Sequence, residues 1–308
     1  MLARFLRQLT AQRLIGIDAG SAVIKVVELL RDHGRLMLVG CFLAEARDGS
    51  TAAVLQQLLA RYDFTAAQVA IGLAAPELTV KAVHFPPMPK KELQNAIQLE
   101  AEQAILNGHT LNDTMVDWYP LTAENSGGVR GVLAVVPKTV MTTRLQPFDA
   151  VGLRPVVMDA EGLALWNAYW LLLGHREDAG NTILLANIGV QKTNLVIVKG
   201  RDQLILIRDL QVGSRAIEAG RGAEWVEEVR DSLVYARAKG GLRTLNAAYV
   251  TGGGSGPKLQ PLLKAAVPAP VTLWDPLEQL ECCRDSPSID RKIGRLLPIA
   301  IGLALRWR

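Results

Sequence analysis

The chain has 308 residues, of which 49% are hydrophobic and 21% are charged, and this length favours two lobes over a single core. The net charge of +4 is small, the basic residues are scattered and aromatic residues are few, so a nucleic-acid-binding surface is not supported. Three cysteines cannot build a disulfide framework, and no apolar stretch reaches the ~20 residues of a membrane-spanning helix. A cytoplasmic globular protein is therefore predicted.

Residues 1–13 have an amphipathic helical pattern, with Leu2, Phe5, Leu6 and Leu9 on one face and the arginines largely elsewhere. They contain no uninterrupted apolar region, so they are not a signal peptide. One interpretation is a basic anchor on an anionic membrane surface. The other, which we favour, is a short helix that packs locally or frays, because terminal segments are usually loosely held.

Alternating and apolar patterns predict the core of a first lobe at 14–50 and 153–180, interrupted by a small α+β insert at 51–152. The lobe core contains strands at 14–18, 23–30, 36–44 and 155–159, and a helix at 161–173. The insert contains helices at 51–62, 90–106 and 137–151, strands at 69–73 and 78–85, and a hairpin of 115–121 with 129–136. Ser50 or Thr51 is the expected N-cap of the first of these helices.

Residues 181–308 are predicted to form the core of a second lobe. The expected elements are a hairpin that ends near 212, helices at 223–238, 258–266 and 288–306, and strands at 247–251 and 271–274. Mixed strands and helices with repeated right-handed units predict a two-lobed α/β fold.

A strand–turn–strand motif occurs twice. In the first copy Asp18 ends an apolar strand and is followed by Gly20 and Ser21; in the second, Asn187 is followed by Gly189, and a β-branched strand resumes at Thr193. Two such copies predict two turns that face one cleft, a geometry that can hold a phosphate chain and its metal from both sides. Gly20 lets the backbone come close, so the N–H groups of Gly20, Ser21 and Ala22 can point at a phosphate. Lys25 adds a possible charge there, or it only solvates the edge of the strand.

Several short motifs occur in the order and spacing of a known family. They are Gly16-Ile-Asp18-Ala-Gly20-Ser21, Pro87-Met-Pro-Lys-Lys-Glu-Leu93, Leu99-Glu-Ala-Glu102, Gly152-Leu-Arg-Pro155, Arg208-Asp209, Gly252-Gly-Gly254 and Gly302-Leu-Ala-Leu-Arg306. With them the chain resembles the PilM family of type IV pilus assembly proteins, within the actin-like ATPase superfamily. The resemblance implies a two-lobed, actin-like (ribonuclease H-like) α/β fold. Its insert would correspond to the small subdomain of the division protein FtsA.

The resemblance also implies a site for ATP and Mg²⁺, with Asp18 holding the metal through water. The residues expected at the nucleotide are Asp18, Gly20, Ser21, Lys25, Asn187, Gly189, Thr193, Gly252, Gly253 and Gly254. Glu161 is the candidate catalytic residue, because a polar group near this crossover orients water in actin-like ATPases; it can equally be a helix N-terminal acid that stabilises the helix dipole. The glycine run either passes flat against an adenine or forms a tight strand-to-helix turn.

Two departures from the family pattern weaken this site. The family usually has an aspartate where this chain has Asn187, and loss of a charge-assisted contact typically costs ~1.5–3 kcal/mol. The family also carries a subdomain that covers the adenosine, whereas the corresponding stretch here, 214–224, is too short to fold alone. We therefore expect binding of ATP and Mg²⁺ to be weak or absent, and enzyme activity to be lacking.

Two functions remain open. The first is a scaffold, cytoplasmic and peripheral to the inner membrane, that binds the N-terminal segment of a PilN-like membrane protein between the insert and the first lobe. The expected apolar wall is Val80, Val83, Phe85, Leu93 and Ile97, unless these residues are core. The second is an active ATPase whose Mg-ATP-dependent closure regulates assembly.

By resemblance, further partners would be the pilus assembly platform and its motor ATPases, with self-association possible. The short second lobe is also similar to the cytoplasmic part of GspL proteins of type II secretion, so the secretion machine stays open. A sugar kinase is disfavoured, because the insert carries no evident base in a substrate pocket.

Overall fold

The structure is a computed structural model that describes residues 12–33, 35–46, 51–61, 68–105, 108–121, 128–174, 180–256, 259–283 and 291–306. All but the last two residues of the predicted N-terminal segment, and the candidate N-cap Ser50, lie outside these ranges. Within them, no helix is long and apolar enough to cross a bilayer.

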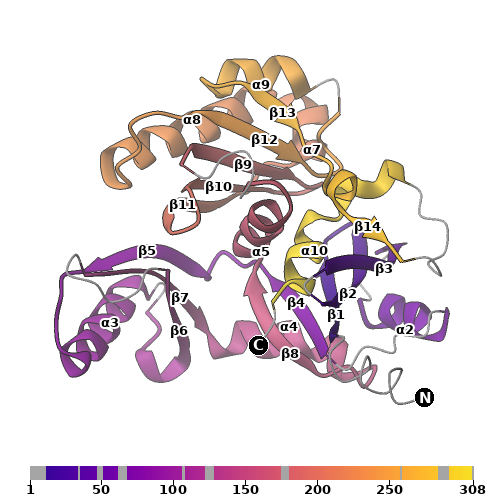
Figure 1. Cartoon of the computed structure of the whole chain (residues 1–308), viewed down its shortest axis with the longest axis horizontal. Helices are drawn as coiled ribbons and strands as arrows, with labels where there is room; N and C mark the ends of the chain where they lie inside the picture. Colours follow the sequence, from indigo (N-terminus) through magenta and orange to yellow (C-terminus); the bar gives the residue numbers. More distant parts are fainter. Residues whose placement is uncertain are drawn as a thin grey trace.

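The first lobe is built on six strands: β1 (Gln12–Ala19), β2 (Val23–Asp32), β3 (Arg35–Glu45), β4 (Gln68–Leu73), β8 (Pro155–Ala160) and β14 (Glu281–Cys282). They form one sheet in the order β14-β3-β2-β1-β4-β8 (Figure 1). β2 pairs antiparallel with β1 and β3, whereas β4 pairs parallel with β1 and β8. Leu14 to Ala19 are all buried, as expected for a central strand that is covered on both faces.

The second lobe repeats this arrangement. Its strands are β9 (Thr182–Ile188), β10 (Thr193–Lys199), β11 (Gln203–Leu210), β12 (Ala247–Thr251) and β13 (Val271–Leu273), in the order β11-β10-β9-β12-β13. Again two antiparallel pairs are followed by parallel strands. Helices α8 (Gly222–Lys239) and α9 (Gln260–Ala266) pack on the outer face of this sheet (Figure 1). The predicted duplication is thus present in the sheet topology.

The insert is smaller than predicted. It consists of a three-stranded antiparallel sheet, β5 (Thr79–Phe85), β7 (Val129–Pro137) and β6 (Thr114–Pro120), with α3 (Lys90–Ala104) against one face. The predicted range 51–152 is therefore wrong at both ends. β4 belongs to the first-lobe sheet, and α2 (Thr51–Arg61) and α4 (Lys138–Asp149) pack on that sheet through Leu55 and Phe148. Hydrophobic periodicity predicts the elements but not which sheet they join.

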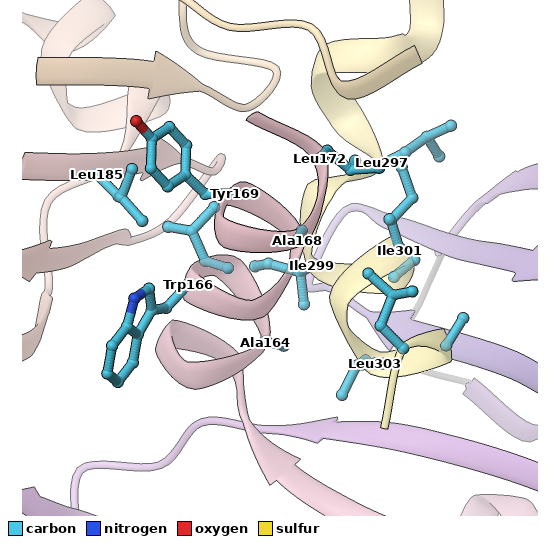
Figure 2. Close-up of a cluster of buried hydrophobic side chains, with 14 of the residues drawn as sticks. Ala164, Trp166, Ala168, Tyr169, Leu172, Leu185, Leu297, Ile299, Ile301 and Leu303 are labelled. Carbon is cyan, nitrogen blue, oxygen red and sulfur yellow. The ribbon is translucent and has the colours of Figure 1, made fainter. Parts of the chain in front are cut away.

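Two helices lie side by side between the sheets: α5 (Glu161–Tyr169) and α10 (Pro298–Ala304) (Figures 1 and 2). Their buried side chains join the cores of both lobes. The contact is close because Gly302 lies against Ala164, where a Cβ on Gly302 would come 1.8 Å from the Ala164 carbonyl oxygen. Gly16 of β1 lies equally close to the backbone of α10, so both glycines are required by packing.

The end of the chain also differs from its prediction. The expected helix at 288–306 is a 3₁₀ segment, Arg291–Leu296, followed by α10, because Pro298 lacks an N–H group and begins a new helix. β14 and α10 return to the first lobe, where they contact β3 and β1. The second-lobe core therefore does not extend to 308 as expected.

Candidate functional site

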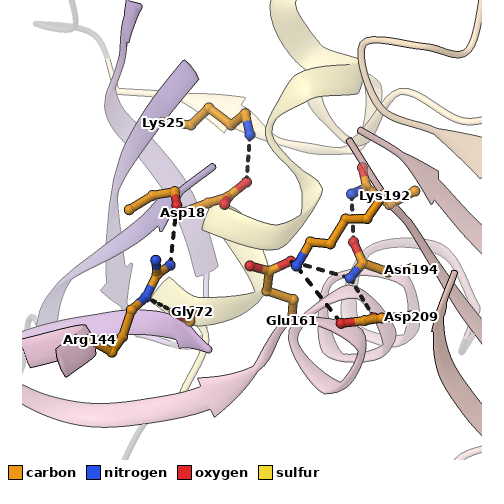
Figure 3. A network of polar contacts seen from close by, with 10 residues as sticks. Asp18, Lys25, Gly72, Arg144, Glu161, Lys192, Asn194 and Asp209 are labelled. Atoms are coloured by element: carbon orange, nitrogen blue, oxygen red, sulfur yellow. Dashed lines mark hydrogen bonds and ion pairs between the residues drawn. The ribbon is translucent and has the colours of Figure 1, made fainter. Parts of the chain in front are cut away.

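The first predicted phosphate turn places Asp18 at the end of β1, opposite Lys25 in the β1–β2 pair. Asp18 is 3% exposed, and Lys25 Nζ lies 2.8 Å from Asp18 Oδ2 (Figure 3). Gly20 permits this hairpin to close, because a Cβ there would meet Lys25 Nζ and the Val23 carbonyl oxygen at 3.0 Å. Lys25 is thus the counter-charge of Asp18 rather than a solvated edge residue.

The second turn leads into a partly buried polar network. Asn187 at the end of β9 donates from Nδ2 to Asn194 Oδ1 over 2.9 Å. Asn194, in turn, donates to Asp209 Oδ1 at 2.8 Å and to Glu161 Oε2 at 3.2 Å. Lys192 Nζ lies 2.6 Å from the same Glu161 oxygen and 3.8 Å from Asp209 Oδ2 (Figure 3). The ammonium group of Lys192 and the amide of Asn194 therefore both interact with the two carboxylates.

Glu161 begins α5, the helix between the lobes, and it is 5% exposed. Its predicted role was to orient water, with a helix N-terminal acid as the alternative. The structure places it in an ion pair with Lys192 at the N-terminus of the helix, where a carboxylate is also favoured by the helix dipole. Both acids that the sequence put in the cleft, Asp18 and Glu161, are thus paired with lysines.

Arg144 of α4 donates to two backbone carbonyl groups that lie near the two acids. Its Nε donates to the Gly72 carbonyl over 2.8 Å and its Nη2 to the Ala19 carbonyl over 3.2 Å (Figure 3). Gly72 lies close to Glu161, since a Cβ on Gly72 would be 3.2 Å from Glu161 Cγ. The residues that sequence reasoning missed are Arg144, Lys192, Asn194 and Asp209. Lys192 gave a signal, being a charged residue within the second turn itself.

The second turn is tied to the chain that follows the β10–β11 hairpin. Gly189 donates to the Lys192 carbonyl over 2.9 Å and accepts from Ser214 N at the same distance. Arg215 N donates to the Val190 carbonyl over 3.1 Å. The N–H group of Gly189 is therefore used inside the protein.

The side chain of Thr193 lies in the core, although its neighbours Lys192 and Asn194 belong to the polar network. It is fully buried, its hydroxyl donates to the Val212 carbonyl over 2.8 Å, and it accepts from Trp225 Nε1 over 3.1 Å. The prediction of Thr193 as a nucleotide contact is contradicted by this placement, because its hydroxyl already donates and accepts.

A Thr193→Val variant is expected to lose about 1–3 kcal/mol of unfolding free energy, because two buried groups lose their partner. Urea denaturation measures this. Thr142→Val is the matched control, because the Thr142 hydroxyl donates to the Lys138 carbonyl at an exposed position of α4. Equal stability of the two variants would contradict the assignment.

The glycine run forms a tight strand-to-helix turn. Gly252 has φ +93°, and its N–H donates to the Arg295 carbonyl over 2.7 Å. Gly254 N donates to the Ile188 carbonyl over 2.9 Å, and a Cβ on Gly254 would lie 2.6 Å from Ile188 Cγ2. A Cβ on Gly253, between them, would come 2.9 Å from Leu296 Cδ2. Of the two open interpretations, the geometry matches the turn.

The short stretch after the second hairpin behaves as predicted. β11 ends at Leu210, a helical segment occupies Ser214–Arg221, and α8 follows at once. Every residue from 180 to 256 is described, and no subdomain intervenes there. This helical segment contacts the second turn through the N–H groups of Ser214 and Arg215.

The predicted peptide wall is largely the core of the insert. Phe85 and Leu93 are buried with Val129, and Val83 and Ile97 pack against them. Of the two open interpretations, this packing matches the core, because α3 covers this face of the sheet. Val80 points to the opposite face, where it packs against the central cluster between the lobes.

That opposite face carries an exposed surface on β6. Met115 and Tyr119 are 47% and 62% exposed, and Asp117 between them is exposed as well. Arg306, just after α10, donates a hydrogen bond to Asp159, and the nearby negative charge of Asp117 interacts favourably with its guanidinium group. Burial is the largest single effect and lowers the pKa of Arg306, but the charge and hydrogen bond of Asp159, together with Tyr119 and Asp117, raise the pKa above its ordinary value, so the guanidinium stays charged. We call Met115, Asp117, Tyr119 and Arg306 the β6 surface.

β6 is an edge strand of the insert, and among the described strands it pairs only with β7. The signal for its exposed side was present in the sequence. Met115, Asp117 and Tyr119 alternate with Val116 and Trp118, and only the latter pair packs against the insert core. An edge strand with exposed apolar side chains can add an extended peptide.

The comparisons with known proteins agree with this architecture. A family model described as type IV pilus assembly protein PilM matches residues 16–219. A solved PilM–PilN type IV pilus biogenesis complex contains a chain that is 23% identical, with a TM-score of 0.78, over 95% of this chain and 98% of that one. It shows that the fold class is as predicted.

More distant solved structures also match. The cytoplasmic domain of EpsL, an inner membrane component of the Vibrio cholerae type II secretion system, is 12% identical, with a TM-score of 0.48 over 97% of this chain and 96% of that one. The ethanolamine utilization protein EutJ from Carboxydothermus hydrogenoformans is 14% identical, with a TM-score of 0.47 over 96% and 89%.

Proposed function

The chain belongs to the PilM family of type IV pilus assembly proteins, and from this premise we propose that it is a scaffold that works without Mg-ATP. It holds the N-terminal cytoplasmic segment of a PilN-like inner-membrane protein and thereby sits at the cytoplasmic side of the assembly platform. The observation that carries the proposal is the pairing of Asp18 with Lys25 and of Glu161 with Lys192.

The residues present do not fit a hydrated magnesium triphosphate. Mg²⁺ binds through carboxylate oxygens, and at Asp18 and at Glu161 it would compete with a lysine that already lies within 2.8 Å of each acid. The amide of Asn187 brings no charge and is already hydrogen bonded to Asn194. Within the described ranges, no three His, Cys, Asp or Glu side chains are grouped as a metal would require. Internal ammonium groups thus take the place of the cation.

The peptide binds along the β6 surface. An extended segment can hydrogen bond to the edge of β6 that faces away from β7, while Tyr119 and Met115 offer apolar contacts to its alternate side chains. Arg306 and Asp117 supply charges at the same place, which favour a peptide with polar groups between its apolar anchors. The solved PilM–PilN complex supports the class of partner, since its chain has the same fold.

The direct test is fluorescence anisotropy with a labelled N-terminal peptide of the PilN-like protein from the same organism. We expect saturable binding whose Kd does not change when ATP and Mg²⁺ are added. The scrambled peptide is the control for sequence-independent binding. A peptide that binds only in the presence of Mg-ATP would refute the scaffold and favour a nucleotide-driven closure.

Calorimetric titration of ATP is expected to give the same weak or undetectable affinity with and without Mg²⁺. Asn187→Asp is expected to restore little binding, because a carboxylate there cannot donate to Asn194 and lies beside the paired acids. Turnover of ATP that disappears in Asp18→Ala would contradict the proposal. So would tight, magnesium-dependent binding by Asn187→Asp alone.

A further inference from the structure

One end of the second lobe carries a group of exposed basic side chains. They are Lys199 and Arg201 at the β10–β11 tip, Arg237 and Lys239 in the last turn of α8, and Arg243 in the following loop. We call these five the basic end. None of them forms an ion pair with a carboxylate of the described residues.

Backbone contacts bring these segments together at the same end of the sheet (Figure 1). Gly200 N donates to the Asn181 carbonyl over 3.1 Å, and Asn246 N donates to the Thr182 carbonyl over 2.8 Å. Gly240, at the end of α8, lies against β11, where a Cβ would come 2.7 Å from the Ile205 carbonyl oxygen. The hairpin tip, the helix end and the loop therefore share one surface.

Exposed apolar side chains lie next to these cations. Val234 and Tyr235 of α8 are 60% and 56% exposed, and Ala238 is exposed one turn later. Arg237 and Lys239 flank them on the helix, since successive residues turn by about 100°. Basic residues in the last turn of a helix also interact favourably with the helix dipole. That interaction does not explain the basic residues at the β10–β11 tip and in the loop, nor the exposure of Tyr235.

We propose that the basic end contacts the anionic phospholipid surface of the membrane. Cations with an exposed aromatic and an aliphatic side chain match a layer of anionic headgroups above acyl chains. Nucleic acid is the less fitting polyanion, because it offers no apolar layer to Val234 and Tyr235. The inference does not depend on peptide capture at β6, which lies on the insert.

Co-sedimentation of the full-length chain with vesicles tests the proposal. We expect binding to phosphatidylcholine vesicles that contain phosphatidylglycerol, little binding to pure phosphatidylcholine, and weakening by salt. The variant Arg237→Glu with Lys239→Glu is expected to reduce the partition coefficient by roughly 20-fold or more. Tyr235→Ser is expected to reduce it by several-fold, because the aromatic anchor is lost.

The matched control is Lys90→Glu with Lys91→Glu, which changes the net charge equally at two exposed positions at the start of α3. Its vesicle binding is expected to remain within about twofold of the parent chain. Equal losses in the two double variants would refute a specific basic end, and so would unchanged binding after the α8 substitutions. Binding of the parent chain to duplex DNA but not to anionic vesicles would overturn the choice of lipid. Circular dichroism melts verify that all variants are folded.

Discussion

Replacing Tyr119 by alanine is expected to weaken binding of the PilN-like N-terminal peptide by about 10- to 100-fold, or about 1.4–2.8 kcal/mol. Tyr119 is 62% exposed on an edge strand of the insert and lies near the charged Arg306. An aromatic side chain that is exposed in the free protein and becomes buried by a peptide contributes most of its apolar area to binding. The anisotropy titration described above measures the change.

The control for Tyr119→Ala is Leu99→Ala, which removes a side chain that is 57% exposed on α3, on the other face of the insert. We expect the parent Kd for this variant. The two substitutions remove exposed apolar area from the same subdomain, so a general loosening of the insert would affect both. If Leu99→Ala weakened the peptide and Tyr119→Ala did not, the peptide would bind on the α3 side.

Replacing Lys192 by methionine is expected to lower the free energy of unfolding by about 2–4 kcal/mol. The substitution leaves Glu161 buried without its counter-charge, and breaking a buried pair by removing one partner typically costs about 3–5 kcal/mol. The side chain of Lys192 is 28% exposed, so solvent reaches the pair and we place the loss below the upper value. Urea denaturation with the parent chain as reference gives the difference.

The double variant Lys192→Met with Glu161→Gln is expected to regain most of the loss. A neutral amide can still accept from Asn194 Nδ2, and no unpaired charge then remains at the start of α5. This coupling distinguishes an ion pair from simple packing of the lysine stem. A double variant no more stable than Lys192→Met would contradict the pairing.

Lys192→Met also tests the proposed replacement of a metal by lysine. If the ammonium group takes the place of a cation, its removal leaves Glu161 and Asp209 with an unsatisfied negative charge. We expect Mg²⁺ to stabilise this variant more than the parent chain in the same denaturation measurement. Equal effects of Mg²⁺ on both proteins would show that the lysine does not substitute for a metal.

Much of the fold could be predicted because its strands and helices depend on local patterns of apolar and polar residues. The alternation in β2 and β3, the apolar runs of β1 and β9 and the proline-started helix α3 all appear near their expected positions. The repeated turn motif predicted the duplicated topology, because each copy carries its own strand, glycine and strand. The stretch 214–224 is likewise too short for a subdomain, and this follows directly from the number of residues.

The candidate site was only half predictable. Asp18, Asn187 and Glu161 were found through the motif and the resemblance, but their partners were not, apart from the suggestion of a charge at Lys25. Asn194 and Glu161 are 33 positions apart, and Arg306 and Asp159 are 147 apart. No local pattern encodes such pairs. The choice between a peptide wall and core stayed open for a related reason, since alternation marks the two faces of β5 but does not say which one α3 covers.

The sequence by itself determined the family, the two-lobed architecture and the turns that end β1 and β9, because each depends on residues that are neighbours along the chain. Only the tertiary structure decided that lysines neutralise the acids, that the exposed face of the insert lies on β6, and that the last helix returns to the first lobe. These outcomes depend on burial and on charges brought together by folding. The energy of such contacts depends on distance in space, which the order of residues does not specify.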